Sequence, residues 1–223
     1  MINNIQPINF NSANNSKLAI RPSMAMKSDN VSFCGVADKA YTALTRTRSG
    51  KDAEELSKLL FSSYEHSFLK ANPQGVKQSW FGKMYDKFYQ KFHCKMEKLA
   101  VKQDEVYIDV IKDSNGKVVG GMSMFVEPEK SMSYVNYIVL APELKRTKKG
   151  KEMLLDMADR IIENTEKHRA FEISWSVRDG GKPYERLMNK IPHYETDVPF
   201  SKYTEYSVFV DKLKDVLKNI RAK

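Results

Sequence analysis

The sequence lacks the features that mark several large classes of protein. It contains no run of about 18 apolar residues, which excludes a hydrophobic transmembrane helix. Its two cysteines, Cys34 and Cys94, are too few for a disulfide framework. Its first residues lack a basic start followed by a long apolar stretch, so we expect no secretory signal and a cytoplasmic location. Because a long apolar run is absent, we also expect no membrane partner.

The composition is that of an ordinary globular domain with a surplus of positive charge. Hydrophobic residues make up 41% and charged residues 29% of the chain, and the formal net charge is +9. Such a surplus attracts anions such as nucleic acid, acidic lipid or a phosphorylated small molecule. The cations gather in two places, since 76–102 holds seven lysines against two acidic residues and 145–151 holds five cations.

The N-terminal residues differ from the rest of the chain. Residues 1–36 are rich in asparagine and serine and show no apolar period, so they cannot bury enough surface to offset their chain entropy. We predict a flexible tail over 1–36, a single domain over 37–211 and a C-terminal helix over 212–223.

Apolar periodicity predicts the elements of the domain, because spacings of three and four residues indicate helices and alternation indicates strands. Helices are expected over 49–68, 76–99, 151–162 and 211–220, with a short helix that carries Leu187 and Ile191. Strands are expected over 41–47, 106–111, 118–126, 133–140, 171–177 and 203–210. The order predicts an α/β protein of mixed α+β type, whose central mixed sheet of about six strands is flanked by helices. The strands at 133–140 and 171–177 are expected to pair in parallel.

The second expected helix has an apolar stripe. Trp80, Met84, Phe88 and Phe92 recur every four residues, and lysines occupy the other side. We interpret this stripe as part of the core or as the wall of a substrate cleft, rather than as a platform on which nucleic-acid bases stack.

The most informative segment runs from Val139 to Leu155. It reads as the end of a strand, then Pro142, then a basic loop, then the start of an amphipathic helix. The N-terminus of a helix presents unpaired N–H groups and the positive end of the helix dipole, and is therefore a ready site for phosphate.

This segment resembles the central motif of the GNAT acyl-CoA N-acetyltransferase superfamily. In that family a strand is followed by Val-x-Pro-x-x-Arg/Gln-x-x-Gly-x-Gly/Ala and then by an amphipathic helix. Without a gap, Leu140 stands at the Val, Pro142 at the Pro, Lys145 at the Arg/Gln and Gly150 at the last Gly. The family's order of elements fits roughly 41–210.

Two positions of the loop depart from the family pattern. Lys148 stands where the first Gly is expected, and Arg146 stands where many members carry a Gly. A glycine lets the backbone approach a pyrophosphate without a Cβ in the way. A lysine there either points outward and adds charge, or marks a site that has lost its ligand.

The resemblance implies a GNAT-like fold, with acetyl-CoA as co-substrate and no metal. It implies direct transfer of the acetyl group to an amine of a small molecule or peptide. In the family, the strand before the loop pairs its backbone with the pantetheine arm, and one N–H polarises the thioester carbonyl. The residues that the resemblance assigns to cofactor binding are Ile138, Val139, Leu140, Lys145, Arg146, Thr147, Lys148, Lys149 and Gly150.

The proton donor for the departing thiolate is less well matched. In the family it is commonly a Tyr on the helix after the next strand, and that position falls on Met188, which cannot donate a proton. Tyr184 lies one helical turn earlier on the same face, and we hypothesise that it replaces the missing acid. The alternative is that Tyr184 is a half-buried packing aromatic.

Other residues invite a chemical role without a pattern that selects among them. Cys94 follows His93, but adjacent residues on a helix point apart and make a poor dyad. The candidates for a catalytic base or a substrate contact are Glu127, Asn136, Glu172 and His193. The four histidines show no metal-ligand spacing.

Two rival functions stay open at this stage. The basic and aromatic face of 76–102 is one basis for a protein that binds nucleic acid or an acidic partner. The departures at Arg146, Lys148 and Met188 are a basis for a GNAT-fold scaffold without catalysis. The acceptor and the oligomeric state also stay open.

Overall fold

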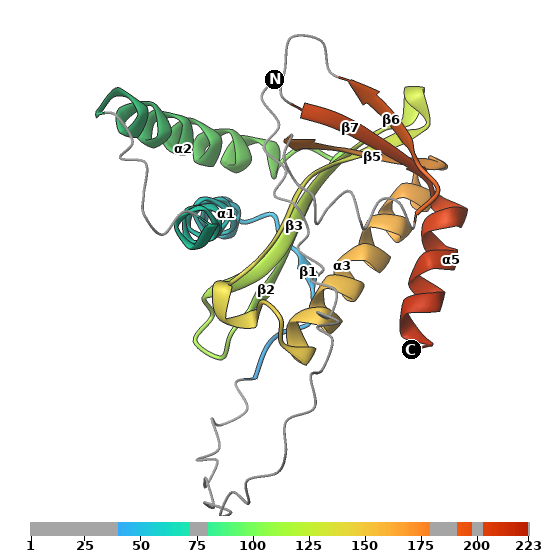
Figure 1. The fold of residues 1–223 in the computed structure, drawn as a ribbon, viewed down its shortest axis with the longest axis horizontal. Coiled ribbons are helices and arrows are strands. Elements are labelled where there is room, and N and C mark those ends of the chain that lie inside the picture. The colour runs from blue at the N-terminus through green and yellow to red at the C-terminus, as the bar shows by residue number, and fades with distance from the viewer. Residues whose placement is uncertain (1–39, 72–79, 179–190, 198–202, 223) are drawn as a thin grey trace, which may run out of the picture.

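The computed structural model describes residues 40–71, 80–178, 191–197 and 203–222. Within them the chain forms one seven-stranded sheet in the order β1-β2-β3-β4-β5-β7-β6. Helices α1 and α2 cover one face of the sheet, and α3 and α5 cover the other (Figure 1). No helix in these ranges is long and apolar enough to cross a membrane.

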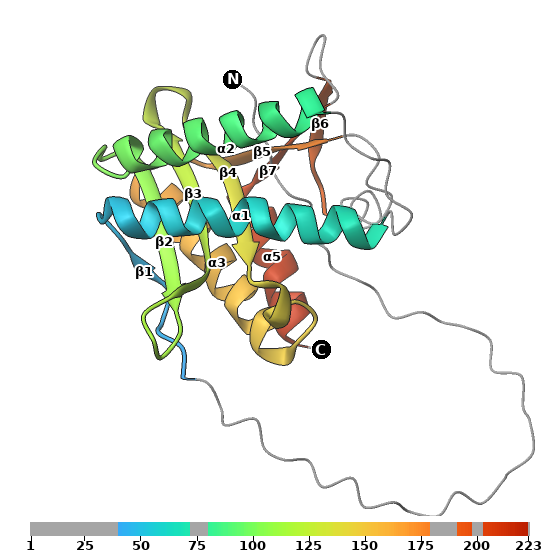
Figure 2. The ribbon, with the colours of Figure 1, turned by 90° about the vertical axis from the view of Figure 1, so that its left-hand side faces the viewer.

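The first face is covered by α1 (Gly50–Ala71) and α2 (Trp80–Ala100), which lie side by side in front of the sheet (Figure 2). The expected N-terminal cap of α1 is present, since the Ser49 hydroxyl accepts a hydrogen bond from the Asp52 N–H at 3.4 Å. Buried Leu56 packs close to the sheet at Gly121, where a Cβ would lie only 2.8 Å from its Cδ1. Glycine at this point of the sheet therefore allows α1 to approach.

The strands β1 (Thr45–Arg46), β2 (Val106–Lys112), β3 (Val118–Glu127) and β4 (Met132–Leu140) form an antiparallel meander. The strand expected over 41–47 is shorter than predicted, because Tyr41 makes only an isolated bridge to Asp113. The hairpin between β2 and β3 turns where the sequence predicts.

The second half of the fold crosses over through α3 (Lys148–Lys167) to β5 (Glu172–Arg178), which pairs in parallel with β4 as predicted. Met153, Met157 and Ile161 on α3 are buried against the second face of the sheet. Their spacing of four residues is that of one helix face.

The C-terminal part of the fold contains β6 (Tyr194–Asp197), β7 (Tyr203–Phe209) and α5 (Val210–Arg221). The prediction of about six strands missed β6, because this short edge strand carries no alternating apolar pattern. α5 is not a separate appendage, since Val210 and Leu217 are buried in the same core as α3.

The interpretation of the α2 stripe as core is wrong. Trp80, Met84, Phe88 and Phe92 are 69%, 50%, 69% and 52% exposed. The helix turns its polar side inward instead, and among its described side chains those of Cys94 and Glu97 are buried.

Candidate functional site

Strands β4 and β5 separate part of the way along the sheet. They pair only from Met132 to Tyr134 of β4, although β4 continues to Leu140 and β5 to Arg178. Beyond Tyr134 no ladder joins the two strands in the part of the chain that the structure describes. The backbone of 138–140, which the motif assigns to cofactor binding, therefore lies where β4 has left β5.

A β-bulge interrupts β4 just before this stretch. Ser123 pairs with Tyr137 and Met124 with Val135, so Asn136 is an extra residue in β4. Bulges re-aim side chains and are common beside active sites. Here the Asn136 side chain donates a hydrogen bond from Nδ2 to Ser123 Oγ at 3.2 Å.

A basic loop joins β4 to α3 and is held by a conventional helix cap. Thr147 Oγ1 accepts a hydrogen bond from the Gly150 N–H at 2.9 Å and donates one to the Leu144 carbonyl at 2.8 Å. A Cβ on Gly150 would lie 2.0 Å from the same carbonyl oxygen, so the loop requires glycine at this position. The motif glycine at 150 therefore has a physical cause within the loop itself.

The two departures from the family pattern leave this loop intact. Arg146, where many members carry glycine, takes the left-handed conformation at φ 68°. A non-glycine residue adopts that conformation at a cost of roughly 1–2 kcal/mol. Lys148 is the first residue of α3 and its side chain is exposed, so it adds charge at the helix N-terminus.

The charge of the loop suits an anionic group. Burial lowers the pKa of Lys145, which is half-buried beneath the loop. Arg146, Lys148 and Lys149 are exposed around it, and Lys149 lies 3.4 Å from Glu152. The cap uses the Gly150 N–H and leaves the earlier N–H groups of the first turn for a ligand. The loop and the dipole of α3 together fit a pyrophosphate.

A second constellation lies between the two helices of the first face and the sheet. Ser57 Oγ is 2.8 Å from His93 Nδ1 and accepts a hydrogen bond from Cys94 Sγ at 3.3 Å. His93 Nε2 lies 4.0 Å from Glu97 Oε1. The Ser123 hydroxyl lies 3.4 Å from both oxygens of Glu97. We call Ser57, His93, Cys94, Glu97, Ser123 and Asn136 the α2 polar cluster.

Burial dominates the electrostatics of this cluster. It raises the pKa of Glu97 to about 7, against a small opposing effect of the Ser123 and Tyr137 hydroxyls. It also lowers the pKa of His93. A carboxyl group that titrates near neutral pH beside a neutral imidazole is suited to accept a proton.

Only one of the four residues that the sequence suggested as a base or substrate contact lies in the α2 polar cluster. Asn136 belongs to the cluster, at the bulge of β4. Glu127 forms an ion pair with Lys130, and Glu172 pairs with Met132 at the end of β4 remote from the loop. His193 contacts the Ile191 carbonyl and Glu195. These three take no part in the cluster.

The structure also bears on the His93–Cys94 pair and on metal binding. His93 and Cys94 form no direct dyad, but both contact Ser57, which is fully buried. Tyr184 and Met188 lie outside the described residues. Among the residues that are described, no group of histidine, cysteine and carboxylate side chains is placed to hold a metal ion.

Sequence reasoning missed Glu97 and Ser57. Both lie on helices whose periodicity marks only apolar positions, and the two residues belong to different helices. The available signal was the side of α2 opposite the stripe, but that side was described only as basic, and Glu97 was not singled out on it.

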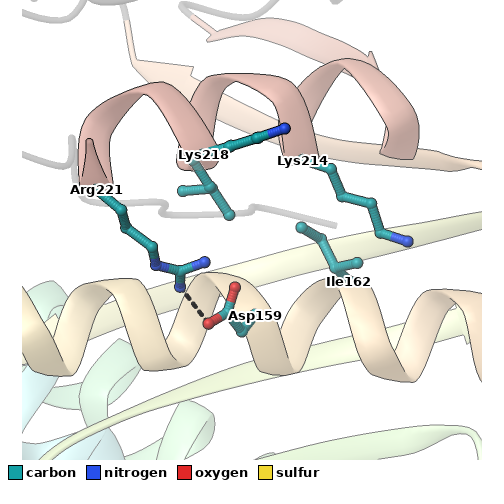
Figure 3. Close-up of a pocket in the computed structure, with 6 residues that line it drawn as sticks. Asp159, Ile162, Lys214, Lys218 and Arg221 are labelled. Carbon is teal, nitrogen blue, oxygen red and sulfur yellow. Dashed lines mark hydrogen bonds and ion pairs between the residues drawn. The ribbon is translucent and has the colours of Figure 1, made fainter.

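A separate pocket lies between α3 and α5 (Figure 3). Its lining residues are Asp159, Ile162, Lys214, Leu217, Lys218 and Arg221. An ion pair between Arg221 and Asp159 bridges the two helices. The pocket shares no residue with the loop or the polar cluster, and we assign it to helix packing.

No protein-family model matches the chain, and no curated protein matches it in sequence. Solved structures do match. The PaiA N-acetyltransferase from Thermoplasma acidophilum, in complex with coenzyme A, is similar with a TM-score of 0.52 and 16% identity over 75% of this chain and 99% of that one. A GNAT-family acetyltransferase from Staphylococcus aureus Mu50 is similar with a TM-score of 0.51 and 14% identity over 77% of this chain and 99% of that one.

At these identities the likeness concerns the fold. The strand–loop–helix unit lies where the motif predicted it, and the bulge and the separated strands come just before it in the chain. The chain has the fold of the GNAT acyl-CoA N-acetyltransferases, which confirms the fold that the sequence motif predicted.

Proposed function

We propose that the protein is an acetyl-CoA-dependent N-acetyltransferase, which moves an acetyl group directly to an amine of a small molecule or peptide. One observation carries the proposal. The edge of β4 that has left β5 leads, through a basic loop that only glycine at 150 permits, to the N-terminus of α3. The fold that this chain shares with GNAT enzymes supports the same conclusion.

The residues assigned to cofactor binding divide between two tasks. The backbone of Ile138, Val139 and Leu140 would form hydrogen bonds with the pantetheine arm. The segment from Lys145 to Gly150 would bind the pyrophosphate. Bound acetyl-CoA would supply the acetyl group as a thioester. A backbone N–H of β4 near the bulge would stabilise the negative charge that develops on its carbonyl oxygen.

An amine must lose its proton before it attacks, and Glu97 is the group that we assign to accept it. Its pKa of about 7 leaves much of the carboxyl ionised at neutral pH, and Ser123 and Asn136 connect it to the bulge of β4. The thiolate that leaves then needs a proton. Tyr184 remains our proposed donor for that step.

Binding of acetyl-CoA is tested by the thermal midpoint, Tm, with and without the ligand. A concentration of about 100 times the Kd adds about 2.7 kcal/mol to the free energy of unfolding. For a chain of this size the Tm is expected to rise by roughly 5–10 °C. The Lys145→Ala, Lys148→Ala double variant should lose most of that rise.

The matched control is Lys117→Ala, Lys167→Ala, which removes two exposed lysines outside the loop and should keep the full rise. A wild-type Tm that does not move with acetyl-CoA would contradict the proposed function. A rise that survives in the Lys145→Ala, Lys148→Ala variant would remove the loop from the site.

A further inference from the structure

The outer side of α2 exposes a continuous band of bulky apolar residues. The exposed fractions of its members lie between 47% and 69%. We call this band the α2 outer face and define it by Met84, Tyr85, Phe88, Phe92, Met96 and Leu99. Figures 1 and 2 show α1 beside α2, and none of the elements drawn in colour lies over its outer side.

Apart from Tyr85, which stacks on Tyr89 of the same helix, no described ring contact involves the α2 outer face. α2 meets the rest of the molecule through its polar side, with Cys94 and Glu97 buried. Six large apolar side chains left in water on one helix exceed the scatter of single apolar residues that soluble surfaces tolerate. Such a face is therefore a candidate binding surface.

Lysines line one flank of this face. Lys83, Lys87, Lys91 and Lys95 recur every four residues, and all four are exposed. Lys98 extends the row and pairs with Glu54 of α1. A residue three or four positions away is a neighbour on a helix surface, so Lys91 adjoins Phe88 and Lys95 adjoins Phe92. The occupant must accept apolar side chains and carry negative charge beside them.

We propose that the α2 outer face binds the surface of an anionic lipid bilayer. A helix with an apolar side and a basic flank lies in the interface plane, with its apolar residues at the boundary of headgroups and acyl chains. The face runs from Met84 to Leu99 of α2 and so offers about 23 Å of contact. The expectation of no membrane partner rested on the absence of a long apolar run, which surface binding does not need.

Two other occupants fit less well. Methionine and leucine side chains give no flat ring for nucleic-acid bases to stack on, yet Met84, Met96 and Leu99 form half of the face. A second copy of the chain would bring its own lysine row to the same seam, where like charges repel. Lipid is the occupant that uses both the apolar band and its flank.

The test is co-sedimentation of the full chain with vesicles of mixed phosphatidylglycerol and phosphatidylcholine, and with vesicles of phosphatidylcholine alone. The mixed vesicles should carry the protein down, and added salt should release it. The Lys87→Glu, Lys91→Glu variant should bind at least about 25-fold more weakly, since each lysine near an anionic surface is worth about fivefold. Phe88→Ser, Phe92→Ser should bind more weakly at every salt concentration.

Matched controls lie outside α2. Phe171→Ser removes another exposed aromatic, and Lys117→Glu, Lys167→Glu reverses two other exposed lysines. Both should bind vesicles as the wild type does. All variants should keep the wild-type Tm, because the changed side chains are exposed.

Four results would overturn the proposal. The first is that the protein stays in the supernatant with the mixed vesicles, and the second is that binding survives Phe88→Ser, Phe92→Ser. The third is a dimer in sedimentation equilibrium that this variant dissociates, and the fourth is binding to RNA in place of vesicles. None of these outcomes depends on acetyltransferase activity.

Discussion

Helices α2 and α3 are built alike and used in opposite ways. They have 21 and 20 residues, and each carries an apolar stripe along one side. α3 turns its stripe to the sheet and buries Met153, Met157 and Ile161, whereas α2 turns its stripe outward and buries Glu97. Periodicity shows that a helix has two sides, but not which side faces the protein.

The difference follows from what each helix meets. α3 crosses an apolar sheet face, where Val119, Met122 and Met124 need cover. α2 meets α1 at Ser57 and β3 at Ser123, and Ser123 in turn accepts a hydrogen bond from Asn136 at the bulge of β4. These polar groups need hydrogen-bond partners when buried. The polar side of α2 supplies them, and its apolar side is left for another surface.

The largest effect expected from this comparison is on catalysis. Glu97→Gln should lower kcat/KM by about 10²–10⁴, because the neutral amide cannot accept the proton of the amine. In the wild type, kcat/KM should rise with pH through about 7, the pKa to which burial raises Glu97. The variant should lose this rise.

Amine-dependent release of thiol from acetyl-CoA measures the rate, and Glu129→Gln in the exposed turn after β3 is the control. A Glu97→Gln variant with wild-type rates at every pH would show that the inward polar side of α2 is only structural.

The second effect compares the two stripes directly. Met157→Ala on α3 should lower the free energy of unfolding by about 2–5 kcal/mol, because it leaves a cavity in the core. Phe88→Ala on α2 should change it by less than about 0.5 kcal/mol. Urea denaturation measures both. A large loss in Phe88→Ala would mean that the α2 stripe packs against the protein after all.

The third effect is a dependence of stability on pH. The folded protein holds a proton on Glu97 up to a pKa of about 7, whereas the unfolded chain releases it near 4.5. Between these values the folded state binds more protons, so stability falls as pH rises, by about 3 kcal/mol from this group. The Glu97→Gln variant should lack this contribution. Urea melts at pH 4.5 and 8 test it, and equal pH dependence in the two proteins would contradict the buried state of Glu97.

The smallest effect concerns the entrance of α3. Arg146→Gly should raise the free energy of unfolding by up to about 1 kcal/mol, because glycine adopts a positive φ without strain. Arg146→Ala keeps the strain and serves as the control. Thermal melts compare them, and a gain of the same size in both variants would assign the effect to charge instead.

Much of the fold could be predicted because its signals are local. Alternating apolar residues predict β2 to β5, and the motif from Leu140 to Gly150 predicts the loop. Glycine is required at 150 because a Cβ there would collide with the Leu144 carbonyl oxygen. β6 could not be predicted, because an exposed edge strand such as Tyr194–Asp197 has no apolar side to reveal it. The α2 polar cluster could not be predicted either, because Ser57, Glu97 and Ser123 meet only through tertiary packing. Tyr184 stays a prediction.

Turnover is the first measurement to make, because we propose that this protein transfers an acetyl group to an amine. The wild-type protein should be incubated with acetyl-CoA and a panel of polyamines, amino acids, aminoglycosides and peptides. We expect thiol release that requires one class of amine, acetylated acceptor in the mass spectrum, and loss of both signals in the Lys145→Ala, Lys148→Ala variant. Bound acetyl-CoA with no amine-dependent thiol release across the panel would contradict it and would favour a GNAT-fold scaffold.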